Sequence, residues 1–148
     1  MIKNILFILT IIPMTHILSG AGLDSFCLLR LSVTEKEITA KNVRFVPEKL
    51  KTLKSFQPRA DHIIFKIVDK NGNVLYMNQV YDPRIIYTED MHHFSNPDKK
   101  QVVTQLGLIE IKFPQFESID RIELYSHNTK SNELIFLNSL NWEEISID

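Results

Sequence analysis

The sequence predicts an all-β protein, an antiparallel immunoglobulin-like β-sandwich of about seven or eight strands. Apolar and polar residues alternate in short runs along the chain, which is the pattern of strands that bury one face and expose the other. Turn residues separate these runs, and no long helical period is present. A small closed barrel is the alternative packing. The Cys…Trp…Cys spacing of true immunoglobulin domains is absent, so the predicted likeness is architectural.

Residues 1–21 are predicted to be a cleaved signal peptide. Lys3 makes the start positive, residues 5–18 form an apolar run, and small residues occupy positions 19–21. The run is shorter than the ~20 apolar residues that a membrane-spanning helix needs, and an uncleaved anchor is the alternative. Residues 22–148 are then expected to form a single β-sandwich domain, periplasmic or secreted, with no membrane contact after signal cleavage.

The charge balance argues against nucleic acid as a partner. The chain has 17 basic and 18 acidic residues. Without Lys3, 16 basic residues stand against 18 acidic ones in the exported part, a net charge of −2. Proteins that bind polyanions concentrate positive charge instead.

Cys27 is the one cysteine of the chain, so it has no partner for an internal disulfide. Alternation places Cys27 on one strand face with Leu29, Leu31 and Val33. We therefore expect a buried thiol that packs as a small apolar side chain. Pairing with a cysteine of another molecule is the alternative.

A β-hairpin is predicted around residues 69–72, because Asp69 can bond the turn backbone and Gly72 can adopt the left-handed conformation. In the preceding strand one face is shared by Ile63, Phe65 and Ile67. In the following strand, 74–80, the two faces are expected to separate Val74, Tyr76 and Val80 from Leu75 and Met77.

Three more strands are predicted toward the C-terminus. Their shared faces are Ile109, Ile111 and Phe113; then Ile122 and Leu124; then Leu134, Phe136, Leu140 and Trp142. Residues 47–56 could form one short helix, with Pro47 in its first turn. Such a helix is too short to be stable alone and would cover one end of a sheet.

Three segments carry a family resemblance: Phe-Lys-Ile-Val-Asp-Lys-Asn-Gly-Asn-Val-Leu-Tyr at 65–76, Tyr-Thr-Glu at 87–89 and Ile-Lys-Phe-Pro at 111–114. Their order resembles a domain that precedes the catalytic unit in immunoglobulin-A-peptidase-type zinc metallopeptidases. In that family the domain is a β-sandwich, so the resemblance implies an accessory module. The chain contains no His-Glu-X-X-His motif, so the resemblance extends to the fold and not to proteolysis.

Residues 89–93 form the one cluster dense in side chains that bind metals. Its candidate ligands are Glu89, Asp90, His92 and His93, and a metal-dependent hydrolase built on this loop is one alternative function. Adjacent strand residues point to opposite faces, so both histidines reach one ion only from an irregular loop. We expect an exposed polar loop instead, with no metal, cofactor or catalytic residue.

Tyrosines are candidate contact residues. Tyr125 is expected on the outward face of its strand, while Tyr81 and Tyr87 flank a segment that contains Arg84. An exposed aromatic ring can stack on a sugar or anchor a protein partner. The sequence therefore predicts a non-enzymatic module of the bacterial envelope or secretome that binds another exported protein or a glycan. A partner or inhibitor of a secreted peptidase is a further alternative.

Overall fold

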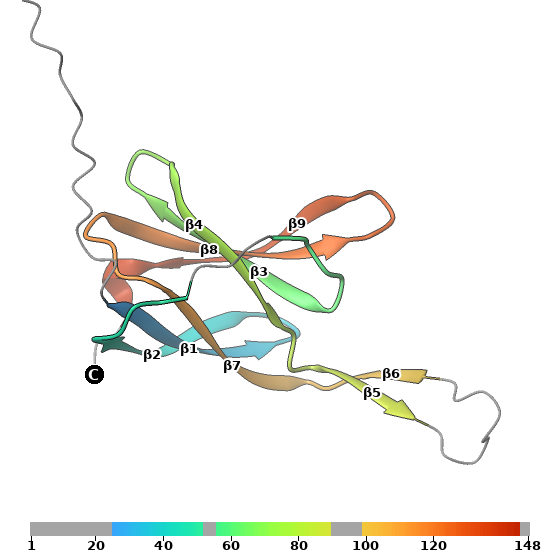
Figure 1. The fold of residues 1–148 in the computed structure, drawn as a ribbon. Helices are drawn as coiled ribbons and strands as arrows, with labels where there is room; N and C mark the ends of the chain where they lie inside the picture. Colours follow the sequence, from blue (N-terminus) through green and yellow to red (C-terminus); the bar gives the residue numbers. More distant parts are fainter. Residues whose placement is uncertain (1–24, 52–55, 90–98, 146–148) are drawn as a thin grey trace, which may run out of the picture.

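The computed structural model describes residues 25–51, 56–89 and 99–145, which form two antiparallel sheets packed face to face (Figure 1). Within these residues there are nine strands and one short 3₁₀ helix, η1 (Trp142–Glu144). Every strand pair is antiparallel. The predicted all-β sandwich is confirmed, and the predicted signal peptide lies outside the described residues.

The strands divide into a three-stranded sheet, a four-stranded sheet and a separate ribbon. The first sheet has the order β2 (Ile38–Val46), β1 (Phe26–Thr34), β7 (Leu106–Pro114). The second has the order β4 (Val74–Tyr81), β3 (His62–Asp69), β8 (Ile119–Asn128), β9 (Glu133–Asn141). The ribbon consists of β5 (Ile85–Glu89) and β6 (Lys99–Val103). The two sheets contain the predicted number of strands, whereas the ribbon is an addition that the sequence did not predict.

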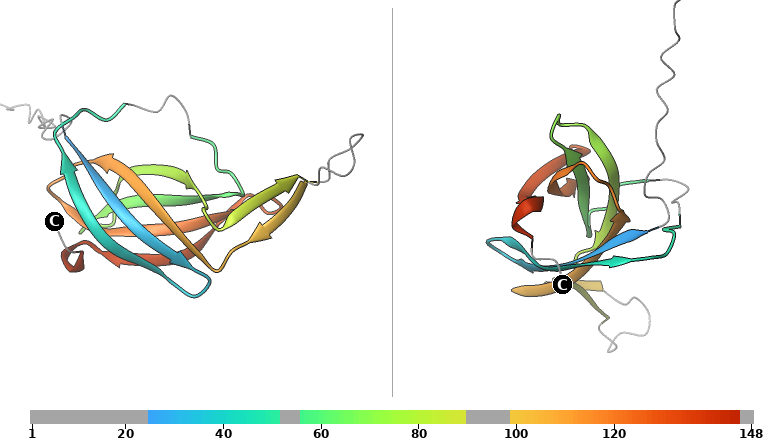
Figure 2. Two further views of the ribbon diagram at one scale, coloured as in Figure 1. Left: turned by 90° about the horizontal axis from the view of Figure 1, so that it is seen from below. Right: turned by 90° about the vertical axis from the view of Figure 1, so that its left-hand side faces the viewer.

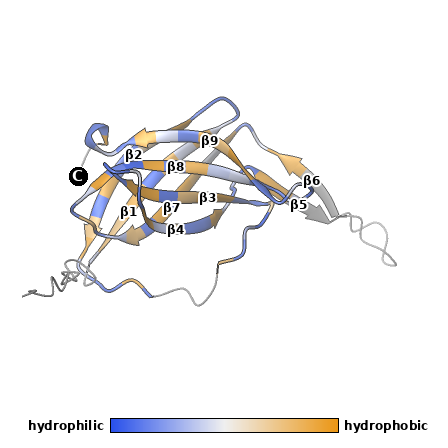
Figure 3. Cartoon of the chain, turned by 90° about the horizontal axis from the view of Figure 1, so that it is seen from above, coloured by the Kyte–Doolittle hydropathy of each residue, from blue (hydrophilic) through white to orange (hydrophobic). Residues whose placement is uncertain are grey.

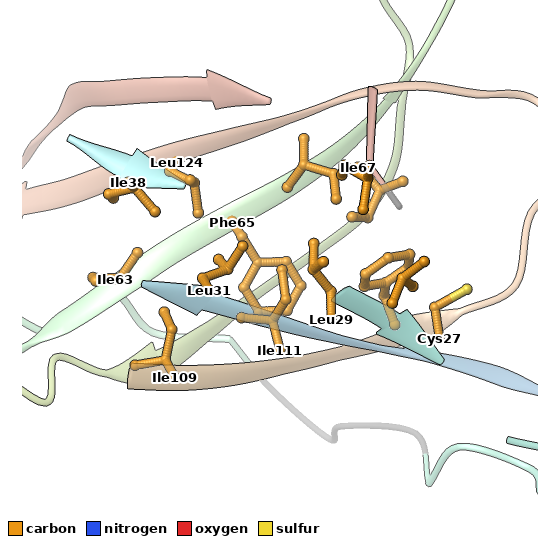
Figure 4. Close-up of a cluster of buried hydrophobic side chains, with 14 of the residues drawn as sticks. Cys27, Leu29, Leu31, Ile38, Ile63, Phe65, Ile67, Ile109, Ile111 and Leu124 are labelled. Atoms are coloured by element: carbon orange, nitrogen blue, oxygen red, sulfur yellow. The ribbon is translucent and has the colours of Figure 1, made fainter. Parts of the chain in front are cut away.

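The hydrophobic core lies between the inner faces of the two sheets (Figure 4). The predicted inner face of β1 is confirmed, and its Cys27 is fully buried. Phe65 of β3 is 1% exposed and lies at the centre of this layer. At one end of the sandwich the rings of Phe113 and Trp142 meet edge to face, with centroids 5.9 Å apart.

The turn between β3 and β4 has the predicted form. Gly72 has a φ of +84°, which favours glycine. Asp69 Oδ1 accepts the backbone N–H groups of Asn71 at 2.9 Å and Asn73 at 2.8 Å, and its Oδ2 accepts the Asn73 side-chain amide at 3.0 Å. These bonds, led by that of the Asn73 side chain, hold the pKa of Asp69 below its usual range.

β-Bulges change two of the predicted strand faces. The β3–β4 register shifts at Ile67/Val68, so Leu75 packs against the core while Val74 is exposed. The β8–β9 register shifts at Leu124/Tyr125. Phe136 consequently faces outward, whereas Leu140, predicted on the same face, packs against the core. An extra residue in one strand reverses the faces on either side of it.

The predicted helix at 47–56 is wrong for the described part of that segment. Residues 47–51 and 56–59 contain no helical turn, and residues 52–55 lie outside the described residues. The chain from 57 to 59 is instead fastened to β4. Gln79 donates its side-chain amide to the carbonyl of Gln57 at 2.7 Å and accepts the N–H of Arg59 at 3.1 Å.

Candidate binding surface

The ribbon leaves the sandwich at the turn Asp82–Arg84, between β4 and β5. Asp82 Oδ1 accepts the Arg84 N–H at 3.0 Å, and the Asp82 carbonyl accepts the Ile85 N–H at 3.0 Å. Asp commonly initiates turns by such side-chain bonds. The same carboxylate binds the guanidinium of Arg84 through Nε–Oδ1 at 3.0 Å and Nη2–Oδ2 at 2.7 Å. The two side chains are only 10% and 18% exposed, and the bond to Asp82 raises the pKa of Arg84.

Arg84 also connects the ribbon to the three-stranded sheet. Its Nη1 donates to the carbonyl of Thr34, at the end of β1, at 2.8 Å. The guanidinium is therefore engaged with the protein itself on two sides. Of the candidate contact residues, Arg84 is placed to position the ribbon rather than to meet a partner.

A close approach of the Asp82–Arg84 turn to β7 fixes the other side of the ribbon's base. A Cβ added to Gly107 of β7 would lie 2.4 Å from Pro83 Cγ, so a larger residue does not fit without movement of the backbone. Next to this contact the N–H of Thr104 donates to the carbonyl of Arg84 at 2.8 Å. At this corner the two strands of the ribbon diverge. β5 follows β4 of the four-stranded sheet, and β6 leads into β7 of the three-stranded sheet (Figure 2).

The ribbon and the beginning of β7 carry a cluster of exposed apolar side chains, which we call the ribbon surface. Each is between 41% and 61% exposed: Ile86, Tyr87, Val102, Val103, Leu106 and Leu108. Ile86 pairs with Val102, whereas Tyr87 belongs to the opposite face of the same two strands. Each face of the ribbon therefore carries exposed apolar side chains near the sandwich, and hydrophobic colour extends onto the projecting β6 (Figure 3).

An open hollow of about 600 Å³ adjoins the base of the ribbon. It is lined by the β1–β2 turn, with Thr34, Glu35, Lys36 and Glu37, and by Gln105 between β6 and β7. A smaller depression beside it reaches Arg84 and Leu137. The rim of the hollow is polar and carries two acidic residues, so it offers charge next to an apolar surface.

Tyr81, a candidate contact residue, lies where β4 leads into the ribbon. Its ring is 40% exposed and meets the ring of His62 edge to face, with centroids 5.7 Å apart. Its hydroxyl donates to the carbonyl of Ile85. The structure thus brings Tyr81, Arg84 and Tyr87 together around the ribbon.

Tyr125 stands on the outward face of β8, as predicted, but away from the ribbon in the four-stranded sheet. Its hydroxyl donates to Glu123 Oε2 at 2.6 Å, and Lys66 Nζ lies 4.5 Å from the ring centroid. Desolvation, followed by the bond to Glu123, raises the pKa of Tyr125 to about 12. On its other side the ring of Phe136 packs edge to face. Tyr125 is therefore part of a surface network rather than a free anchor.

The candidate metal loop lies almost wholly outside the described residues. Glu89 ends β5 and pairs through its backbone with Lys99, whereas Asp90, His92 and His93 are not described. Among the described residues, no three His, Cys, Asp or Glu side chains gather in a group that could hold a metal ion. The metal-dependent alternative stays a prediction.

Sequence reasoning missed five of the six residues of the ribbon surface and found only Tyr87. A signal for three of the others, Ile86, Val102 and Val103, was present, because Ile85-Ile86 and Val102-Val103 are consecutive apolar pairs that break the alternation of a half-buried strand. Such a pair places one apolar side chain on each face.

Family models, curated proteins and solved structures gave no significant match to this chain. Within the described part of the chain, no helix is long and apolar enough to span a membrane.

Proposed function

We propose that the chain is an exported, non-enzymatic β-sandwich that acts by contact, as a binding or accessory module of the bacterial envelope or secretome. The observation that carries this proposal is the ribbon surface, which has exposed apolar side chains on both faces of the ribbon and projects beyond the sandwich. A lone two-stranded ribbon is at best marginally stable in water. Clustered exposed apolar side chains commonly mark a surface that a partner covers.

The base of the ribbon supports the same proposal. The buried bonds of Asp82 and Arg84 and the contact of Gly107 with Pro83 hold the ribbon in one direction. A surface that is already oriented loses less entropy when it binds, so more of the contact energy appears as affinity.

Capture from the producing cell's envelope fraction and culture medium tests the contact surface. The bait is protein expressed from the full sequence, compared with a double variant, Val102→Ser with Val103→Ser, which removes one exposed apolar side chain from each ribbon face. Phe136→Ser is the matched control, because Phe136 is 57% exposed on β9 and outside the ribbon. We expect the same partner on wild type and control and none on the double variant. Equal capture by all three, or by none, contradicts the proposal.

Export is tested separately by fractionation and by the mass of the mature chain. We expect the protein outside the cytoplasm, beginning at Gly22. A chain that retains residues 1–21 in the membrane contradicts the export part of the proposal and leaves the contact surface to the capture experiment.

A further inference from the structure

We propose that the partner of the ribbon is a second copy of this chain, with β6 of one copy pairing antiparallel to β6 of the other about a two-fold axis. The result is a continuous sheet in the order β5, β6, β6, β5 that joins two sandwiches. This inference rests on the proposed function, because it names the occupant of the same ribbon surface.

The free edge of β6 lies on the side of the β1–β2 turn. β7 continues β6, and β1 pairs with one edge of β7 as far as Thr34 opposite Leu106. Pro83 and Arg84, which lead into β5, lie over one face of β7 at Gly107, because a Cβ added there would meet them. β5 pairs with one edge of β6, and no described strand pairs with the other edge. In Figure 2 the β1–β2 turn lies beside the bend between β7 and β6.

The backbone of β6 offers a defined set of groups at this edge. The Thr104 N–H points toward β5, since it donates to the carbonyl of Arg84. In an extended strand the N–H and C=O of alternate residues point the same way. The groups of residue 102 therefore point toward β5 as well, and those of residues 101 and 103 point to the free edge.

A copy of β6 is complementary to this edge. Two identical strands that run antiparallel about a two-fold axis present the same pattern of donors and acceptors to each other, and two-fold dimers are the commonest oligomers. The pairing also places the exposed apolar residues at 102 and 103 of both copies side by side. Self-pairing therefore extends a marginal ribbon into a wider sheet.

Charge favours the same arrangement. β6 begins with Lys99-Lys100, and the hollow beside its far end is lined by Glu35, Lys36 and Glu37, which together carry a net charge of −1. In antiparallel pairing the start of the copy's β6 runs beside the end of the first β6. The backbone positions of the copy's two lysines then lie next to the hollow that carries the glutamates. Both copies make this contact, so the two-fold axis doubles any gain from it.

Single engineered cysteines test the geometry. In variants of the full chain with Gln101→Cys, Val102→Cys or Val103→Cys, the residue nearest the axis faces its own copy, with Cα atoms about 4.5–5.5 Å apart. That separation suits a disulfide. Native Cys27 does not interfere, because it is buried and its burial raises the thiol pKa to about 12. We expect at least one of the three variants to form a cross-linked dimer under mild oxidation by oxidised glutathione.

Tyr87→Cys is the matched control. Tyr87 is as exposed as the β6 residues, but it lies on β5, and the two β5 strands of the proposed sheet are about 14 Å apart. We expect no cross-link there. Efficient cross-linking at position 87 and none on β6 overturns the proposed pairing.

Sedimentation over a wide range of concentration measures the association itself. We expect a monomer–dimer equilibrium for the wild type. Val103→Pro removes an N–H that points to the free edge and should abolish the dimer, and Val103→Glu should weaken it at least about ten-fold, because a charge then lies at the paired edge. A wild type that stays monomeric at every concentration overturns the inference.

A charge exchange tests the orientation. Reversal of the glutamates, Glu35→Lys with Glu37→Lys, should weaken the dimer about three- to ten-fold, and so should Lys99→Glu with Lys100→Glu. All four changes together should restore most of the affinity, because opposite charges meet again. If the losses of dimer affinity in the two double variants simply add when all four changes are combined, this orientation is overturned.

The two proposals fail in different ways. If the chain is monomeric and its ribbon variant no longer captures a partner of different sequence, self-pairing is overturned and the contact function stands. A monomeric chain whose capture is unchanged by the ribbon variant overturns both.

Discussion

The sandwich and the ribbon are built from the same kinds of apolar residue, but only the sandwich buries them. In the sandwich each strand has an inner face that meets the opposite sheet, and residues such as Leu29 and Phe65 are almost inaccessible. In the ribbon, Ile86 and Val103 belong to opposite faces of two strands that no other described strand covers. Alternation therefore suits a strand with one covered face, whereas exposed apolar residues on both faces are typical of a strand that another molecule covers.

The largest loss of stability is expected from a change in the core. Phe65→Ala leaves a cavity between the sheets and should lower the free energy of unfolding by about 3–5 kcal/mol, measured by urea denaturation. Val103→Ala on the ribbon should change it by only about 0.5 kcal/mol in the monomer. Equal losses for the two variants would mean that the ribbon is as much a part of the cooperative fold as the core.

The next largest effect is expected at the base of the ribbon. Asp82→Ala leaves the largely buried guanidinium of Arg84 without its carboxylate, which should cost about 2–3 kcal/mol. Amide hydrogen exchange should accelerate most in β5 and β6, because Asp82 and Arg84 hold the ribbon to the sandwich. Unchanged exchange in the ribbon would contradict the anchoring role, and Arg30→Ala, in an exposed ion pair, is a control with little effect.

The hairpin turn should give a smaller effect that depends on pH. The folded pKa of Asp69 is lowered, so its contribution is present above the unfolded carboxyl pKa of about 4 and is lost as the pH falls through the folded value. Asp69→Asn should therefore destabilise the protein at neutral pH, since its amide faces the donor of Asn73. The difference between variant and wild type should shrink in acid. Denaturation at a series of pH values measures this, and a constant difference would contradict it.

The smallest effect is expected at Ile86. Ile86→Ser should leave the monomer's stability within about 0.5 kcal/mol of the wild type, because the side chain is already exposed. Denaturant midpoints at low protein concentration measure this. A loss as large as that of Phe65→Ala would show that Ile86 has a covering layer within its own chain.

Alternation along the chain was sufficient to predict the sandwich core and failed where local geometry departs from a regular strand. The core face of Cys27 and its neighbours follows from period-two spacing alone. The exposure of Val74 and Phe136 depends on bulges, and a single extra residue leaves no mark in the sequence that distinguishes it from a regular strand position.

The ribbon surface was predicted only in part, for a different reason. Tyr87 is recognisable as an exposed aromatic residue of a strand. The role of Arg84 depends on the carbonyl of Thr34, fifty positions away in the chain. It also depends on the carboxylate of Asp82, which from the sequence alone could equally have faced water. Such contacts are set by how the two sheets meet and not by spacing along the sequence.

The corner at Pro83 and Gly107 has a mechanical consequence. β5 of the ribbon is connected to β4 in the four-stranded sheet, and β6 is connected to β7 in the three-stranded sheet. Tension applied at the far end of the ribbon would pull β4 and β7 along their own lengths, so many ladder bonds would share the load in shear instead of opening one at a time. A ribbon anchored in this way resists extension through both sheets at once.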